Sequence, residues 1–215
     1  MSEYEHEPVP GLPGVLPAGE RMLWQGAPDR ALLARTAFHT RKVAFYFAVL
    51  TGFAFVTAVP RLGEGAAALL GTAATALVGL AGIGLLHLLA WVTARATIYT
   101  LTDRRVVLRI GVAIPKCINL PLAKVAAIDL RGGAGDSGDV ALKMTGMNRI
   151  GYAVIWPHAR PGRIAVPQPM LRALPDAATV AGQIAEACRA LGGTEIAEIA
   201  APAPKIMHRP IQVAA

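Results

Sequence analysis

His87 is the one ionisable side chain well inside a long apolar run, in the stretch GLLHLLAWV. A neutral imidazole inside a membrane can ligate a metal centre, including the magnesium of a bacteriochlorophyll, so His87 is a candidate pigment ligand. Its place near the polar end of the run also allows a structural role, in which the ring reaches the lipid headgroups or forms a hydrogen bond within the protein. The sequence leaves both interpretations open and indicates no other cofactor.

Catalytic and metal-binding patterns are missing from the rest of the sequence. GAGDSG at residues 133–138 matches G-x-G-x-x-G, but a strand-like DVALKMTG follows it, where a phosphate-binding loop needs a helix N-terminus. Cys117 and Cys188 lack the spacing of a zinc site or a disulfide framework. His158 and His208 lie in loop-like sequence without obvious partners. We therefore expect that the protein is not an enzyme and holds no metal.

The composition indicates a membrane protein with one modest water-soluble domain. Apolar residues make up 54% of the chain and charged residues only 16%, which is too apolar for an average soluble domain. The formal net charge of +7 comes largely from basic residues beside the apolar runs, where they orient helices and contact anionic lipid. Aromatic and basic residues do not interleave along a recognition element, so we expect no nucleic-acid binding.

Two apolar runs, residues 43–59 and 66–93, predict a transmembrane hairpin over residues 43–93. Each is long enough to cross about 30 Å of hydrocarbon, and PRLGEG between them has the Pro and Gly of a tight turn. The alternative, two buried helices of a soluble bundle, needs polar faces that these runs lack. Arg61 is the only basic residue in the turn, whereas several lie outside the hairpin: Arg35, Arg41, Lys42, Arg95, Arg104 and Arg105. This asymmetry predicts that both termini are cytoplasmic.

Small residues follow one face of the second predicted helix. Gly71, Thr75 and Gly79 recur every four residues, a spacing that lets membrane helices approach closely. The stripe is therefore either a packing surface inside the hairpin or a docking surface for another membrane protein.

After the apolar runs, residues 95–193 predict a cytoplasmic α+β domain. Short β-rich runs between turn residues favour an antiparallel sheet or partly open barrel, with strands expected at residues 97–101, 106–110, 117–120, 125–130, 140–144 and 153–156. LPDAATVAGQIAEACRALGG then predicts a helix that caps the sheet. Its apolar face consists of Val180, Ile184, Ala187, Cys188 and Leu191.

The two ends of the chain differ from the parts between them. Residues 1–20 are acidic and rich in Pro and Gly, which predicts a flexible leader, and residues 194–215 predict a loosely ordered tail. Residues 21–42 are amphipathic and basic. They predict a segment along the cytoplasmic membrane surface, with Trp24 and Phe38 as interface anchors.

Several stretches together carry a resemblance to known membrane proteins. WQGAPD at residues 24–29, FHTRKVAFYF at residues 38–47, the hairpin and the stretch at residues 99–130 resemble the photosynthetic-complex assembly proteins of purple bacteria, which are encoded beside the H subunit of the reaction centre. The part from Tyr99 onward is also similar to the bacterial pleckstrin-homology-like family. The residues that match its motif are Tyr99, Leu101, Thr102, Asp103, Arg105, Gly111, Pro121, Leu122 and Lys124.

The resemblance implies a factor that promotes assembly of the photosynthetic reaction centre and core light-harvesting complex by protein–protein contact. It implies a pleckstrin-type antiparallel sheet closed by the C-terminal helix, in a multi-pass protein of the bacterial inner (intracytoplasmic) membrane. The expected partners are reaction-centre or core light-harvesting subunits, membrane lipids and a second copy of the chain. Arg104 and Arg105, in a turn expected close to the bilayer, are candidate contacts with headgroups or an acidic client.

The alternative is a membrane-anchored lipid-binding or signalling adaptor. A basic pocket among the loops would favour it, but Arg104, Arg105, Lys143 and Arg149 are too dispersed along the sequence to indicate one.

Overall fold

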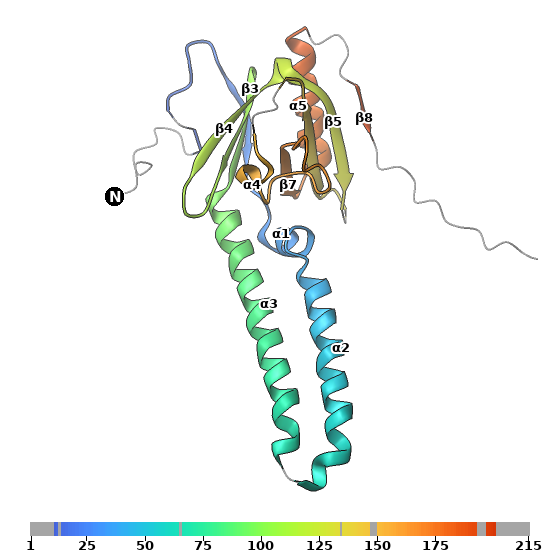
Figure 1. Cartoon of the computed structure of the whole chain (residues 1–215). Coiled ribbons are helices and arrows are strands. Elements are labelled where there is room, and N and C mark those ends of the chain that lie inside the picture. Colours follow the sequence, from blue (N-terminus) through green and yellow to red (C-terminus); the bar gives the residue numbers. More distant parts are fainter. Residues whose placement is uncertain are drawn as a thin grey trace, which may run out of the picture.

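The computed structural model describes residues 11–12, 14–64, 66–133, 135–146, 150–192 and 197–200. Two long helices form a hairpin that extends from one end of a β domain, and a C-terminal helix packs on that domain (Figure 1). This arrangement confirms the predicted fold class.

The hairpin consists of α2 (Thr40–Ala58) and α3 (Leu70–Ala96). Two 3₁₀ turns, Val59–Glu64 and Ala66–Leu69, connect them, so regular helix begins later in the second run than residue 66. Only 6% of the most apolar window of α2 and 11% of that of α3 are buried. The core helices of a soluble protein would be mostly buried, so both helices have the length and composition to cross a membrane.

One sheet has the strand order β1-β2-β3-β4. Its antiparallel strands are β1 (Met22–Gly26), β2 (Ile98–Thr102), β3 (Arg105–Ile110) and β4 (Lys116–Pro121).

The first strand corrects the interpretation of residues 21–42. Met22–Gly26 pairs with β2 instead of lying along a membrane surface, and α1 (Arg30–Thr36) follows it. Trp24 packs against the core of the β domain, and Phe38 is buried beside α1, so neither is a free interface anchor.

The other sheet has the order β7-β6-β5-β8. Its strands are β5 (Val125–Gly132), β6 (Gly138–Met144), β7 (Met170–Leu174) and β8 (Ala197–Ala200), of which only β8 is added in parallel. The strand predicted at residues 153–156 is wrong, because Tyr152–Ile155 forms the short helix α4 and β7 takes the place beside β6. A short apolar run does not by itself distinguish a strand from a helix.

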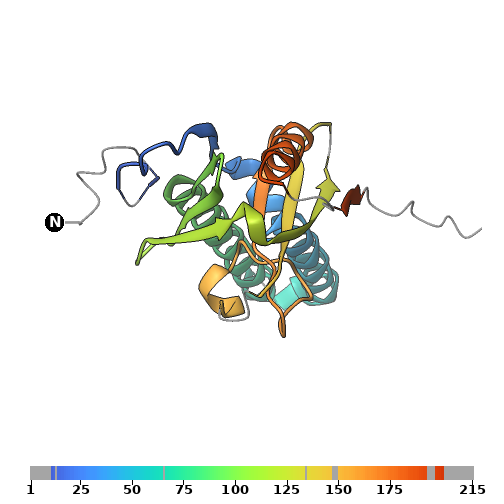
Figure 2. The ribbon, with the colours of Figure 1, turned by 90° about the horizontal axis from the view of Figure 1, so that it is seen from above.

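Helix α5 (Ala177–Ala190) packs across the second sheet, as the view along the hairpin axis shows (Figure 2). Its buried residues include Val180, Ile184, Ala187 and Cys188, which confirms most of the predicted face. Leu191 lies just after the helix and is exposed, so its assignment to that face was wrong. The core of the domain fills the space between the two sheets and this helix.

The described end of the predicted leader packs on the domain. Leu12 is buried, and Glu20 is buried in an ion pair with Arg105, with 2.8 Å between Arg105 Nε and Glu20 Oε1. The leader prediction is therefore wrong for these positions, while residues 1–10 lie outside the described residues.

Candidate functional site at the junction of hairpin and β domain

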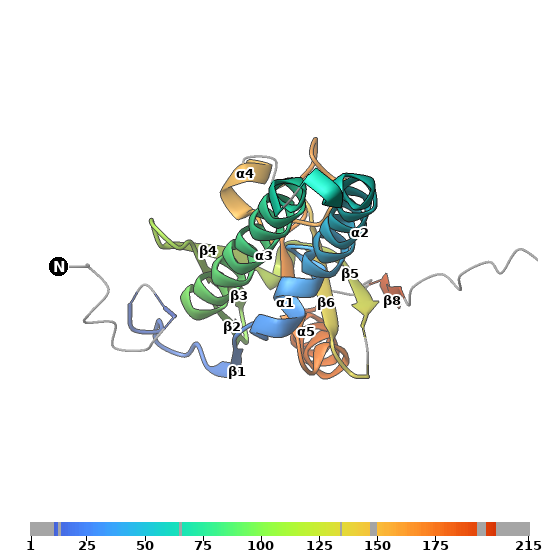
Figure 3. The same ribbon diagram turned by 90° about the horizontal axis from the view of Figure 1, so that it is seen from below.

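Helix α1 ties the hairpin to the β domain. Asp29 caps the helix, because its carboxylate accepts a hydrogen bond from the Leu32 backbone N–H at 2.7 Å. From the side, α1 lies where the hairpin meets the β domain (Figure 1), and from below it is seen beside the domain end of α2 (Figure 3). Its apolar face joins a buried cluster shared with α3 and β7, which consists of Leu33, Ala34, Phe38, Ala90, Ala94 and Ala173. The alanines let these elements approach closely.

A chain of buried hydrogen bonds joins the end of α3 to the β domain. The Arg172 backbone N–H donates to Tyr99 Oη at 3.1 Å, and Tyr99 Oη lies 2.7 Å from His158 Nδ1. His158 Nε2 lies 3.2 Å from Thr97 Oγ1, which donates to the Thr93 carbonyl at 2.8 Å. When the neutral imidazole of His158 carries its proton on Nε2, every hydrogen bond of this chain has a donor and an acceptor.

Burial keeps both rings of this chain neutral. It lowers the pKa of His158 to about 3, and the positive charge of Arg172 lowers it further. Burial also raises the pKa of the Tyr99 phenol. Tyr99 is 0% exposed and His158 is 1% exposed, so no substrate can reach this pair of acid–base side chains. The arrangement is a structural joint.

Arg172 and Asp139 form a buried charged pair next to this joint. Each residue is 5% exposed, and Arg172 Nε lies 4.0 Å from Asp139 Oδ2. Arg172 also donates to the Pro157 carbonyl at 3.0 Å and to the Thr36 carbonyl at 3.3 Å. Burial lowers the pKa of Arg172, while the negative charge of Asp139 opposes that shift. One side chain therefore connects β7 to the end of α1 and to the loop after α4.

Asp139 also fixes an unusual backbone position. Ala173 has a φ of 55°, in the left-handed region that disfavours residues with a Cβ. Its N–H donates to Asp139 Oδ1 at 2.8 Å, and its carbonyl accepts from the Asp29 N–H at 2.8 Å. These two hydrogen bonds hold the strained backbone of β7 at Ala173 against the start of α1.

A cavity of about 520 Å³ opens beside this pair. It lies between the β5–β6 hairpin, the corner between α1 and α2, and the loop before β7. The basic side chains of the lining are Arg35, His39, Lys42, Arg131 and Arg172. Asp139 is the only acidic residue in the described lining, and it already pairs with Arg172. The described lining is therefore predominantly basic.

His87 has a hydrogen-bond partner within its own helix. Its Nδ1 lies 2.9 Å from the Ile83 carbonyl, one turn earlier in α3. The ring is exposed and lines a shallow cavity with Arg35 and Arg41 at the domain end of the hairpin. This arrangement agrees with the structural interpretation, and pigment ligation by His87 stays a prediction.

The small-residue stripe faces the inside of the hairpin. A Cβ built on Gly79 would lie 2.8 Å from Cβ and Cγ of Phe47 in α2. Thr75 Oγ1 donates to the Gly71 carbonyl at 2.8 Å, and both residues line a cleft between α2 and α3. Packing within the hairpin thus accounts for Gly79, and docking of another membrane protein at Gly71 and Thr75 stays a prediction.

Gly79→Ala should separate the two helices. We expect a loss of about 1–3 kcal/mol, because the new methyl group overlaps the base of the Phe47 side chain, which cannot swing away as a flexible tip would. The measurement is the thermal midpoint of the purified protein in mild detergent. Gly84→Ala is the matched control, since its Cβ would meet nothing within 4 Å and alanine favours a helix. Equal midpoints for the two variants would contradict the close contact.

Arg104 and Arg105 lie at the end of the β domain away from the hairpin. Strand β2 begins at Ile98, directly after α3, and the turn at its other end is about 17 Å farther on. The turn thus lies away from the hairpin, and contact of this turn with a bilayer stays a prediction. Arg104 is exposed, whereas Arg105 donates to both carboxylate oxygens of the buried Glu20, at 2.8 and 3.0 Å. Arg105 thus has a structural role, and Arg104 stays a candidate contact.

The junction brings together residues that sequence reasoning left apart. The sequence indicates no obvious partner for His158, yet its two ring nitrogens lie within hydrogen-bond distance of Thr97 and Tyr99. Arg172 carried one signal that could have revealed it, because a lone charge within the apolar stretch MLRAL needs a buried partner. Within the part of the chain that the structure describes, no three His, Cys, Asp or Glu side chains gather to hold a metal ion.

Comparison with known proteins supports the fold. The model of the bacterial PH domain family matches residues 45–187. The chain is also similar to a Rhodobacter capsulatus protein described as an uncharacterized 23.7 kDa protein in the puhA 5′ region. The two are 40% identical over 191 residues, which cover 87% of this chain and 88% of the relative. No solved structure matches the chain.

Proposed function

Because this chain belongs to the bacterial PH domain family, we propose that its β domain is a binding module, and that the protein is a membrane-bound assembly factor without catalytic activity. It would promote assembly of the photosynthetic reaction centre and core light-harvesting complex. The observation that carries the proposal is the similarity to the relative in the puhA 5′ region. We take that region to be the chromosomal neighbourhood of the assembly proteins that the sequence resembles.

The proposed location is the bacterial inner membrane, with the β domain and both termini in the cytoplasm. Both helices are long and apolar enough to span a membrane, and their domain ends lie together (Figure 1). Arg41, Lys42 and Arg95 lie at that end, against Arg61 at the turn. This distribution of charge supports the cytoplasmic assignment.

Contact surfaces of two kinds support a role in assembly. Large apolar side chains cover the outside of the hairpin, among them Phe45, Val49, Phe53, Leu77 and Leu80. In a membrane they would contact lipid or a client's helices. The β domain would hold the soluble part of that client, or a second copy of the chain. An assembly factor must leave its client, so an interface of moderate size is expected.

The test is to purify the tagged protein from its native membrane in mild detergent and to identify the polypeptides that come with it. We expect reaction-centre or core light-harvesting subunits, and we expect deletion of the protein to lower the amount of core complex. Arg104→Ala should weaken this association and leave the thermal midpoint unchanged, because Arg104 is exposed. Arg105→Ala is unsuitable, because it would leave Glu20 buried without its partner.

Two outcomes would redirect the proposal. Normal core-complex levels after deletion would contradict an assembly role. A protein that came alone from the membrane would favour the alternative, a membrane-anchored lipid-binding or signalling adaptor, which the basic cavity supports. An absorption spectrum of the same sample tests His87, since bound pigment should disappear in His87→Ala if this ring is a ligand.

A further inference from the structure

We propose that the basic cavity at the junction binds the phosphate group of an anionic membrane lipid. The inference rests on the proposed membrane placement and not on the role in assembly. It adds a binding site at the junction, which neither the family match nor the relative's description gives.

The cations of the cavity exceed what the described protein groups neutralise. Arg131 and Asp139 are directly paired positions of β5 and β6, but Asp139 already accepts from the Ala173 N–H and faces Arg172. Among the described residues, neither Arg131 nor Lys42 has an ion-pair partner. The Nε of the buried Arg172 forms no hydrogen bond. A bound anion would relieve the repulsion between these cations.

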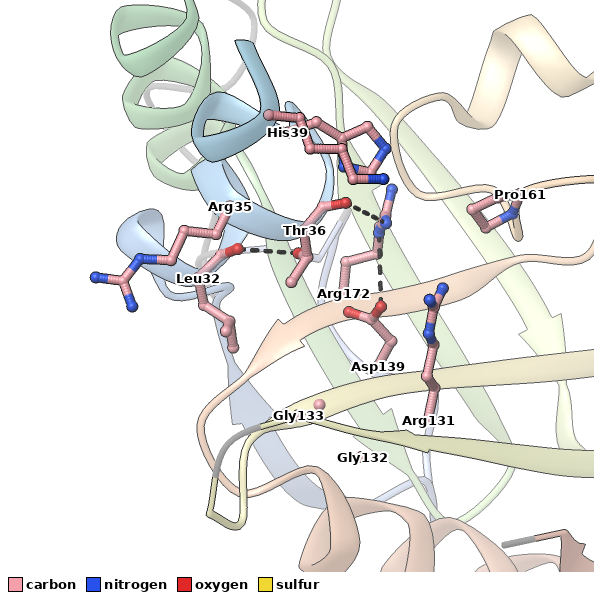
Figure 4. Close-up of a pocket in the computed structure, with 12 residues that line it drawn as sticks. Leu32, Arg35, Thr36, His39, Arg131, Gly132, Gly133, Asp139, Pro161 and Arg172 are labelled. Atoms are coloured by element: carbon pink, nitrogen blue, oxygen red, sulfur yellow. Dashed lines mark hydrogen bonds and ion pairs between the residues drawn. The ribbon is translucent and has the colours of Figure 1, made fainter. Parts of the chain in front are cut away.

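The side chains are placed to meet one ligand. Figure 4 shows Arg131 and Arg172 extending in the same direction from the sheet, toward His39 at the start of α2, while Arg35 points away. The positive charge of Arg131 acts on Arg172, which agrees with their closeness. Helix α2 also has no acidic residue in its first turn and no side-chain cap. Its positive end therefore adds to the attraction for an anion.

The cavity lies where a lipid headgroup would be. His39 and Lys42 line it, and the apolar surface of α2 begins with the next residues. Below Lys42, exposed side chains follow the same helical face at Phe45, Val49 and Val56. A phosphate in the cavity would therefore leave the acyl chains along this stripe. A soluble anion would use only the basic side chains of the cavity. The exposed apolar stripe of α2 beside them therefore favours a lipid.

The site should be tested by native mass spectrometry of the full-length, delipidated protein in mild detergent. We expect adducts of phosphatidylglycerol to form at lower concentration than adducts of phosphatidylcholine. Lys42→Gln combined with Arg131→Gln should weaken phosphatidylglycerol binding roughly tenfold to thirtyfold, because each removes a cation from the site. The control is Lys116→Gln with Arg189→Gln, which removes two exposed cations outside the cavity and should leave binding unchanged.

Three results would overturn the proposal. These are equal affinity for the two lipids, equal effects of the two double variants, and full displacement of the lipid by inorganic phosphate at similar concentration, which would assign the site to a soluble anion. None depends on which polypeptides co-purify. Failure of this site and failure of the assembly role are therefore separate results.

Discussion

Arg172→Met is expected to destabilise the protein by about 3–5 kcal/mol, because it leaves the Asp139 carboxylate buried without a counter-charge. Methionine fills much of the same space but donates no hydrogen bond. The Pro157 and Thr36 carbonyls would lose their donor at the same time. The measurement is guanidinium unfolding in mild detergent, followed by tryptophan fluorescence, since Trp156 packs edge-on against Phe38 at this junction.

A double variant separates the charge from the hydrogen bonds. Asp139→Asn combined with Arg172→Met removes both charges, while an amide oxygen can still accept from the Ala173 N–H. We expect it to recover part of the loss, with a coupling free energy of about 1–3 kcal/mol between the two positions. Arg189→Met on the exposed side of α5 should change little. A loss below about 1 kcal/mol for Arg172→Met would show that the pair does not hold the junction.

The hairpin and most strands could be predicted because their signals are local. Uninterrupted apolar runs need no distant partner to indicate a membrane helix. The turn at Asp103 and Arg104 separates two β-rich runs, which pair in the structure as β2 and β3. Helix α5 begins and ends within a residue or two of its predicted limits, since Pro175 and Gly192 bound it.

The sequence did not predict the elements that depend on distant partners. Strand β1 lies at the edge of its sheet and is mostly exposed, so its five residues have no apolar alternation of their own. It is specified by pairing with β2, more than 70 residues away. Helix α1 likewise owes its position to Ala90, Ala94 and Ala173 rather than to its own sequence.

The candidate site was missed for the same reason. Three elements supply the main cations of the cavity: Lys42 lies in the first turn of α2, Arg131 near the end of β5, and Arg172 in the middle of β7. No sequence motif links these residues. Their closeness is a property of the sheet order β7-β6-β5 and of α1 beneath it. In the sequence alone, these cations are dispersed.

The junction explains the abrupt change of chemistry after the second apolar run. A buried hydrogen-bond network connects Thr93 and Thr97, at the end of α3, with His158 and Tyr99 of the β domain. Because these groups are buried and fully bonded, the hairpin cannot tilt against the β domain without breaking them. The orientation of the helices therefore fixes which face the domain presents to a client or to the lipid surface.

This coupling predicts a stability that falls in acid through His158. Its pKa in the folded protein is about 3, against about 6.5 in the unfolded chain, so the unfolded state binds one more proton between these values. The contribution is fully present above pH 6.5 and is lost as the pH falls toward 3, at up to about 1.4 kcal/mol per pH unit. The free energy of unfolding from pH 7.5 to 4 measures this slope.

His158→Phe should remove that slope and leave a protein that is about 1–3 kcal/mol less stable at pH 7.5, because Tyr99 loses its acceptor. The difference between wild type and variant should therefore shrink as the pH falls. Tyr99→Phe is the control that keeps a buried, titrating imidazole, so it should lower stability and retain the acid slope. If His158→Phe kept the wild-type slope, other groups would cause the acid sensitivity, and the neutral imidazole would not be what joins hairpin and domain.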